Sequence, residues 1–268
     1  MKFNRKLLKY ELVNVTSNLL VLMFGLALPL GLALLFSFVF RGEEEARQIN
    51  TQMMVLMSMI VPLSTMFIGH AESYSRELES GAIQRFKLFG YSERTQLTAK
   101  LLANVIFLLG TLAIYFAVLI FVLDIAPPSA PALLTYIGFL ISFSVIVLIL
   151  GHAIATLCGR AGPTQGVTMA MYFAFMILGG VMGVNPTQFP APIRILSQAL
   201  PLYYIAAQID GYFVFLDFWM GGSYGHFLPL ILSMIGFAVV SIGLLIFSVW
   251  LNKKGKRRSG DPKPVYDE

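Results

Sequence analysis

The fold class of this chain is decided by residues 19–40, LLVLMFGLALPLGLALLFSFVF, which carry no charged side chain. A helix needs about 20 apolar residues to cross the roughly 30 Å hydrocarbon core of a bilayer. Hydrophobic residues make up 57% of the 268-residue chain and charged residues 12%, against about 45–50% and 25% in soluble proteins. The sequence therefore predicts an all-α polytopic membrane protein.

Five further apolar runs follow, and with the first they predict six transmembrane helices in a single domain over residues 1–268. They are residues 53–70, 101–123, 133–157, 167–184 and 227–251. The run 167–184 is short and is marginal for a full crossing. Pro62 lies inside the second span and is compatible with it, because neighbouring helices can satisfy the carbonyl group that a proline leaves free.

Lys and Arg are distributed unevenly over the segments that connect these spans. With the N-terminus inside, sixteen of them lie on the cytoplasmic side and three on the outer side. Positive residues accumulate on the cytoplasmic side of membrane proteins, so both ends are predicted inside (N-in/C-in), with residues 252–268 as a cytoplasmic tail. The same placement explains the net charge of +5 without a nucleic-acid partner.

Two segments do not fit simple spans. Residues 1–18 combine basic and apolar faces, which predicts a helix lying in the headgroup plane; a basic tail that only sets topology is the alternative. Residues 186–224 are apolar but broken by prolines and by Arg194 and Asp217. They predict an outer re-entrant helical hairpin before the last span, with a surface amphipathic loop as the alternative.

The cysteine and histidine residues do not form the patterns typical of a metal site or a disulfide. Cys158 is the single cysteine, so an intramolecular disulfide and a Cys-rich metal site are excluded. The three histidines lack the i, i+4 spacing of a helical zinc motif. His152 lies at membrane depth, where a polar residue usually faces the bundle.

The segment 72–95 is long, highly charged and predicted to lie in the cytoplasm. Within it Leu78, Ala82, Phe86 and Phe89 recur at helical spacing, so one face of a helix is apolar and the charges point elsewhere. Mixed acidic and basic residues suit a protein partner better than an anionic lipid surface. We therefore expect a helix that docks a soluble protein.

The stretch SRELESGA (75–82), followed by Arg85 and by Lys100 at the head of the next span, resembles the cytoplasmic signature of type-2 ATP-binding-cassette (ABC) exporter permeases. The residues FP (189–190) and SQALPL (197–202) are similar to that family's outer hairpin. The resemblance covers essentially the whole chain. The sequence departs from the family at Ala82, where threonine is common, and at Phe89-Gly90, where a proline-containing turn is common; both affect loop geometry.

The resemblance implies a mechanism in which two six-span subunits pair, as a homodimer or a heterodimer, and each rests on a separate ABC ATPase subunit through a coupling helix. No G-x-x-x-x-G-K-[ST] motif occurs in this chain, so we expect no cofactor here, with ATP and Mg²⁺ on the ATPase. A solvated helix face is the alternative for the expected ATPase contacts. These contacts are Arg76, Glu77, Glu79, Gly81, Arg85 and Arg160.

Three glycines, Gly179, Gly180 and Gly183, give the fifth span a small-residue face. Such a face usually means close helix packing and, if functional, a dimer interface.

The predicted spans contain no Asp, Glu, Lys or Arg, which argues against ion-coupled transport. We expect a prokaryotic cell-membrane exporter of hydrophobic or amphipathic compounds, such as drugs, lipids or peptides, with no catalytic residues of its own. A sodium-extruding permease is the alternative in the same class, and an intramembrane enzyme or a scaffold in others.

Overall fold

The computed structural model describes residues 5–40, 46–182, 184–209 and 212–258, and in them the fold is almost wholly helical. The first half of the chain contains α1 (Arg5–Thr16), α2 (Leu19–Leu22), the π-helix η1 (Met23–Ala27), α3 (Leu28–Val39), α4 (Ala46–Ser58), α5 (Ile60–Pro62), the π-helix η2 (Leu63–Gly69), α6 (His70–Ser80), α7 (Ala82–Leu88) and α8 (Glu93–Val122). The second half contains α9 (Ala130–Cys158), α10 (Ala161–Leu178), the 3₁₀ helix η3 (Pro186–Gln188), α11 (Ala191–Gln198), α12 (Pro201–Ala206), β1 (Gln208–Ile209), β2 (Tyr212–Phe213), α13 (Val214–Trp219) and α14 (Phe227–Arg258).

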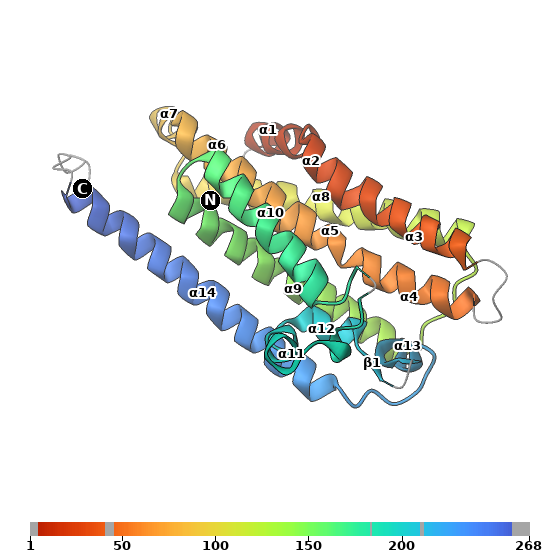
Figure 1. Ribbon diagram of the computed structural model, residues 1–268. Coiled ribbons are helices and arrows are strands. Elements are labelled where there is room, and N and C mark those ends of the chain that lie inside the picture. The colour runs from red at the N-terminus through yellow and green to blue at the C-terminus, as the bar shows by residue number, and fades with distance from the viewer. Residues whose placement is uncertain (1–4, 41–45, 183, 210–211, 259–268) are drawn as a thin grey trace.

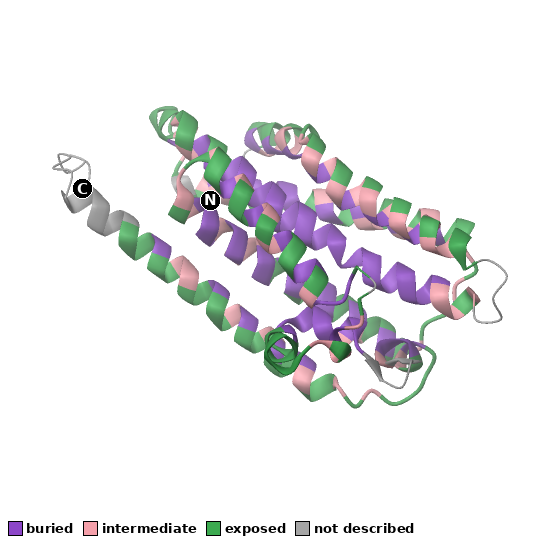
Figure 2. Cartoon of the chain, in the orientation of Figure 1, coloured by how far each residue is buried: buried purple, intermediate pink, exposed green. Residues whose placement is uncertain are grey.

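One helical rod, Ala46–Ser80, forms the axis of the bundle. It joins α4, α5, η2 and α6 end to end, and its most apolar stretch is entirely buried (Figure 2). The corresponding stretches of α2–α3, α8 and α14 are only 22% buried. These outer helices therefore carry the apolar surface that faces lipid or another subunit.

Five helical segments in the described ranges are long and apolar enough to cross a membrane, which confirms the all-helical membrane class. Helix α10, which corresponds to the predicted fifth span at 167–184, is not among them. It begins six residues earlier than predicted and its first turns contain Thr164 and Gln165, which lower its mean hydropathy. The count of six spans and the N-in/C-in topology stay predictions.

Both π-helical segments adjoin a proline. Pro29 follows η1 and Pro62 precedes η2. A proline has no backbone N–H to donate, so the carbonyl groups four residues earlier, at Gly25 and Ser58, lose their usual helical partner. The two segments pack together, since a Cβ on Gly25 of η1 would lie 3.2 Å from the Ser64 side chain of η2. Spans 1 and 2 are therefore irregular at the same depth.

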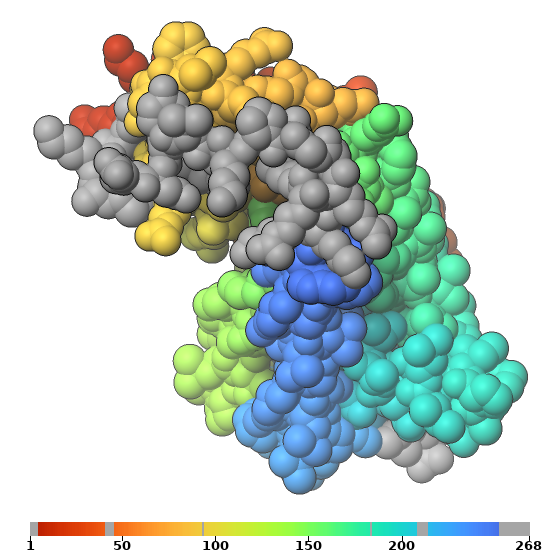
Figure 3. All heavy atoms as spheres, turned by 90° about the vertical axis from the view of Figure 1, so that its left-hand side faces the viewer, coloured from red at the N-terminus to blue at the C-terminus, as the bar shows by residue number. Residues whose placement is uncertain are grey.

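Different helices gather at the two ends of the bundle. Figure 1 places α7, α1 and the end of α14 toward one end, and α11, α12 and α13 at the other. Viewed from the side in Figure 3, blue α14 runs down one face between the yellow-green segment and the cyan one.

The predicted interfacial helix is α1, and its buried side chains Leu7, Glu11 and Val15 pack on α8. Protein therefore covers one face of this helix.

The predicted re-entrant segment 186–224 is a compact cap of short elements. A two-residue β pair, Gln208 with Phe213 and Ile209 with Tyr212, joins α12 to α13. Trp219 of α13 donates from Nε1 to the Ala126 carbonyl oxygen at 2.8 Å, which ties the cap to the loop between α8 and α9. Whether the cap enters the bilayer stays a prediction.

Candidate functional site

The predicted coupling region begins as a direct extension of the buried rod. Helix α6 ends at Gly81, whose φ of +68° suits glycine, and its N–H bonds to the carbonyl oxygens of Glu77 and Leu78. Helix α7 follows without a spacer and ends near Gly90, at φ +83°. Ser92 then caps α8 by accepting from Thr95 N at 3.3 Å. Only Gly81 therefore separates α7 from the helix that continues the buried rod.

The predicted apolar face of this region is wrong in part. The spacing predicts one helix from Leu78 to Phe89, but Gly81, in the left-handed region, breaks the helix and changes which side chains of α7 face inward. Ile83 is consequently buried beside Tyr74 and Ala155. Phe89 is 77% exposed and Leu88 88% exposed, so an apolar tip projects from the end of α7.

A buried ionic cluster ties three helices together beneath this tip. The ammonium of Lys100 on α8 lies 2.8 Å from the Glu11 carboxylate on α1 and 2.6 Å from the Glu77 carboxylate on α6. Its third partner is the Ser73 hydroxyl at 2.8 Å, which also accepts from Asn14 at 2.9 Å. A buried charge needs such partners, because removing it from water is costly.

A third carboxylate, Glu72, has partners at the start of α2 and on α6. It accepts from Asn18 Nδ2 at 2.9 Å and pairs with Arg76 at 2.5 Å, one turn along the helix. Partial burial, followed by the charges of Glu77 and Glu11, raises the pKa of the Tyr10 hydroxyl. The ring of Tyr10 packs edge-on against that of Phe86 on α7, so α1 contacts this helix as well.

Glu79 links α6 to the start of α10, which follows the loop at Gly159 and Arg160. Its carboxylate accepts from the Ala161 N–H at 2.9 Å, at the start of α10. A carboxylate is favourable there because the first N–H groups of a helix lack partners and the helix dipole is positive. The neighbouring Arg160 is exposed, so Glu79 and Arg160 lie at the same surface.

The six expected ATPase contacts thus fall into two groups. Five belong to the surface at this end of the bundle: Arg76, Glu79, Gly81, Arg85 and Arg160. The sixth, Glu77, is turned inward onto Lys100 and is 9% exposed. Sequence reasoning missed the pairing of Glu11 and Glu77 with Lys100, because these residues lie far apart in the chain and no local pattern joins them.

The glycines of the expected dimer face pack inside this chain. A Cβ on Gly179 would lie 2.6 Å from the Leu202 Cβ, and one on Gly180 would lie 2.7 Å from Pro186 Cδ. Because these two positions have no side chain, the cap can pack closely against the end of α10. This packing explains why both residues are glycine. Gly183 lies outside the described residues, and the dimer role stays a prediction.

Two histidines that the sequence treats separately meet in the interior. His70 Nε2 lies 3.2 Å from His152 Nδ1, and Asn104 Nδ2 lies 3.1 Å from His70 Nδ1. The expectation that His152 faces the bundle is confirmed. Among the described residues no group of three or more His, Cys, Asp or Glu side chains could hold a metal ion.

These features define a multi-pass membrane subunit whose buried second span ends in a surface helical turn. The family of ABC-2 family transporter proteins matches residues 43–247. The chain belongs to that family, as the resemblance predicted, and it is a transmembrane subunit rather than the ATPase itself. No curated protein and no solved structure matches the chain.

Proposed function

We propose that this chain is the permease subunit of an ABC exporter that moves hydrophobic or amphipathic compounds outward, driven by ATP hydrolysed on a separate ATPase subunit. The continuity of α6 with the buried rod carries the proposal, because a force on α7 reaches the bundle centre without an intervening loop. ATP and Mg²⁺ belong to the ATPase. The membrane is prokaryotic, and a second permease subunit completes the pathway.

The surface that meets the ATPase consists of α7 and the start of α10. The apolar tip Leu88-Phe89 supplies contact area, and Arg85 and Arg160 supply charge. Exposed aromatic, Leu and Arg side chains at one surface favour protein association. Glu79, near the end of α6, fixes that helix against the start of α10 through Ala161 N.

The proposal is tested by measuring ATPase stimulation and efflux in proteoliposomes that contain the permease and its co-purified ATPase. Glu79→Lys should lower both by at least about tenfold, because it removes the acceptor at Ala161 and reverses a surface charge. Glu79→Gln keeps an acceptor and should retain most of the activity.

The matched control is Thr98→Lys, which adds a cation to an exposed position of α8 whose hydroxyl bonds only to the Arg94 carbonyl oxygen of its own helix. It should leave both activities unchanged. Normal coupled efflux by the folded Glu79→Lys protein would contradict the docking assignment. ATP-dependent flux of Na⁺ in place of an amphipathic dye would favour the sodium-extruding alternative.

A further inference from the structure

An apolar groove runs along the bundle surface between α8 and α9, in the half that lies away from α7. It has a volume of 480 Å³, and its walls include Leu109, Leu112, Phe116 and Ile120 of α8 and Ile137 and Ile141 of α9. Both rim isoleucines of α9 are exposed, at 44% and 60%. The groove therefore opens sideways, toward the bilayer.

The length of the groove matches one leaflet. Eleven residues separate Leu109 from Ile120, which is about 16 Å of helix and roughly half of a 30 Å hydrocarbon core. The loop 125–128 closes the end where α8 finishes. That loop is fixed, because Ala126 donates to Thr51 Oγ1 at 2.9 Å and accepts from Trp219 at 2.8 Å.

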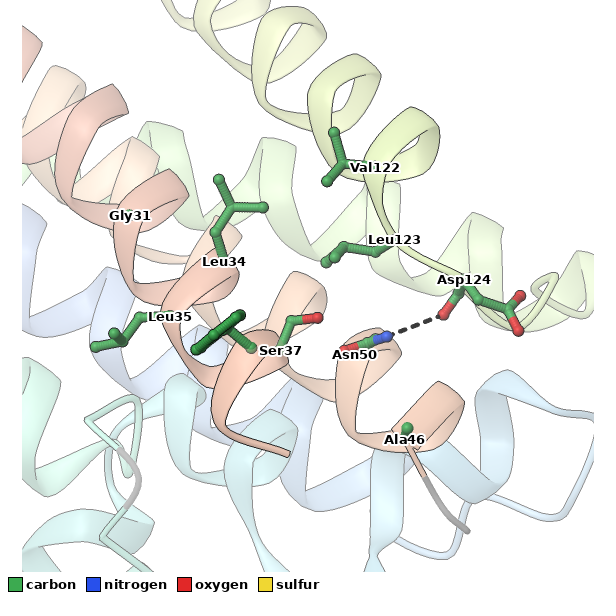
Figure 4. A pocket seen from close by; sticks show the side chains of 10 residues that line it. Gly31, Leu34, Leu35, Ser37, Ala46, Asn50, Val122, Leu123 and Asp124 are labelled. Carbon is green, nitrogen blue, oxygen red and sulfur yellow. Dashed lines mark hydrogen bonds between the residues drawn. The ribbon is translucent and has the colours of Figure 1, made fainter. Parts of the chain in front are cut away.

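An exposed pair of opposite charges lies at the closed end. Arg47 Nε is 3.3 Å from Asp124 Oδ1, and Arg47 Nη2 donates to the carbonyl oxygen of Ile125, a residue of the groove wall, at 3.3 Å. The side chains are 54% and 76% exposed. Figure 4 shows Asn50 bonded to the Asp124 backbone, while the Asp124 carboxylate points away from the 740 Å³ cavity between α3 and α4.

We propose that this groove binds one zwitterionic phospholipid with a primary amine, such as a phosphatidylethanolamine. One acyl chain fills the groove, the phosphate meets Arg47 and the ammonium meets Asp124. The choice of lipid follows from charge complementarity, because the phosphate and the ammonium of its headgroup match Arg47 and Asp124. The exposed pair between Arg47 and Asp124 is worth only about 0–1 kcal/mol, so the two side chains can exchange each other for the lipid. The topology of the proposed function would put this lipid in the outer leaflet.

Headgroup chemistry decides the selectivity, because an acyl chain gains little on leaving one hydrocarbon environment for another. Phosphatidylglycerol offers the phosphate but no cation for Asp124. Phosphatidylcholine offers a quaternary ammonium without an N–H donor. Either loss should cost about one charge-assisted hydrogen bond, or at least about fivefold in affinity.

The test is native mass spectrometry of the purified full chain, titrated with palmitoyl-oleoyl phosphatidylethanolamine, phosphatidylglycerol or phosphatidylcholine. The protein should retain one phosphatidylethanolamine with at least about fivefold preference. Asp124→Asn should abolish the preference. Arg47→Gln should weaken the binding of all three lipids alike, because each has a phosphate, whereas Arg47→Lys should keep the binding. Ile141→Trp should fill the groove and lose the lipid.

The matched control is Ile114→Trp, at a 52% exposed position of α8 that does not line the groove. It should bind the lipid normally. Equal affinity for the three lipids, or unchanged preference in Asp124→Asn, would overturn the proposal. The proposal would also be overturned if the protein formed a dimer that Ile141→Trp dissociates, because the groove would then be a contact between subunits. Coupled efflux does not depend on this site, so its failure leaves the proposed function standing.

Discussion

The ammonium of Lys100 is held between two carboxylates from different helices, and all three side chains are withdrawn from solvent. Lys100→Met would leave Glu11 and Glu77 close together without a counter-charge. We expect this variant to lose about 3–5 kcal/mol of unfolding free energy, because removing one partner strands a buried charge. Thermal unfolding of the detergent-solubilised protein measures the loss.

Two further variants separate charge from packing. The triple variant Glu11→Gln, Glu77→Gln, Lys100→Met carries no net charge in the cluster, so it should be more stable than Lys100→Met alone. Lys9→Met removes an exposed cation from α1 and should change stability by less than about 0.5 kcal/mol. Equal stability of Lys100→Met and the unaltered protein would refute the assigned role of the cluster.

At the scale of elements, the irregular segment η2 is held in place by close backbone contact with α9. A Cβ on Gly151 would lie 2.7 Å from the Phe67 carbonyl oxygen, which belongs to η2. Gly151→Ala should therefore push α9 away from the second span and destabilise the protein by about 1–3 kcal/mol. The shift in the midpoint of thermal unfolding reports it.

The same helix offers a matched control. A Cβ on Gly138 would meet no atom of a neighbouring element within 4 Å, so Gly138→Ala adds the same methyl group without a clash. This variant should keep or slightly raise the unfolding temperature, because alanine favours helix by up to about 1 kcal/mol over glycine. If Gly151→Ala and Gly138→Ala destabilised the protein equally, the close contact with Phe67 would not be the cause of the effect.

The sequence predicts lipid-facing helices well and the central one less well. The span expected at 133–157 lies within α9 (Ala130–Cys158), because apolar side chains continue along almost the whole helix. The span expected at 53–70 belongs to the longer rod Ala46–Ser80. Its first turns contain Asn50 and Thr51, which bond to the loop after α8, so protein rather than lipid satisfies them and hydropathy underestimates the helix.

The candidate site was predictable only where charge lies on the surface. Glu79 and Arg85 could be placed from the motif alone, since a helix ending at glycine displays them. The inward turn of Glu77 could not, because it depends on Lys100, 23 residues along the chain, and on Glu11 of a helix expected to rest on lipid. Such long-range pairing leaves no local periodicity to detect.

At the scale of the whole molecule, α1, α7 and the far end of α14 gather at one end of the bundle (Figure 1). Sixteen of the nineteen Lys and Arg residues belong to segments assigned to that side. Moving a cationic side chain into the bilayer costs about 2.5–3.5 kcal/mol or more. The end that carries α7 is therefore expected to remain in the cytoplasm, where an ATPase would find its ATP.

Cysteine labelling in intact cells measures this orientation directly. Cys158→Ser removes the single cysteine, after which Leu88→Cys marks the tip of α7 and Ser223→Cys marks the opposite end, both at exposed positions. A membrane-impermeant maleimide should label Ser223→Cys in intact cells and Leu88→Cys only in inverted vesicles. If Leu88→Cys reacts from outside, α7 cannot meet an ATPase that consumes cytoplasmic ATP, and the coupling assignment fails regardless of how Glu79 behaves.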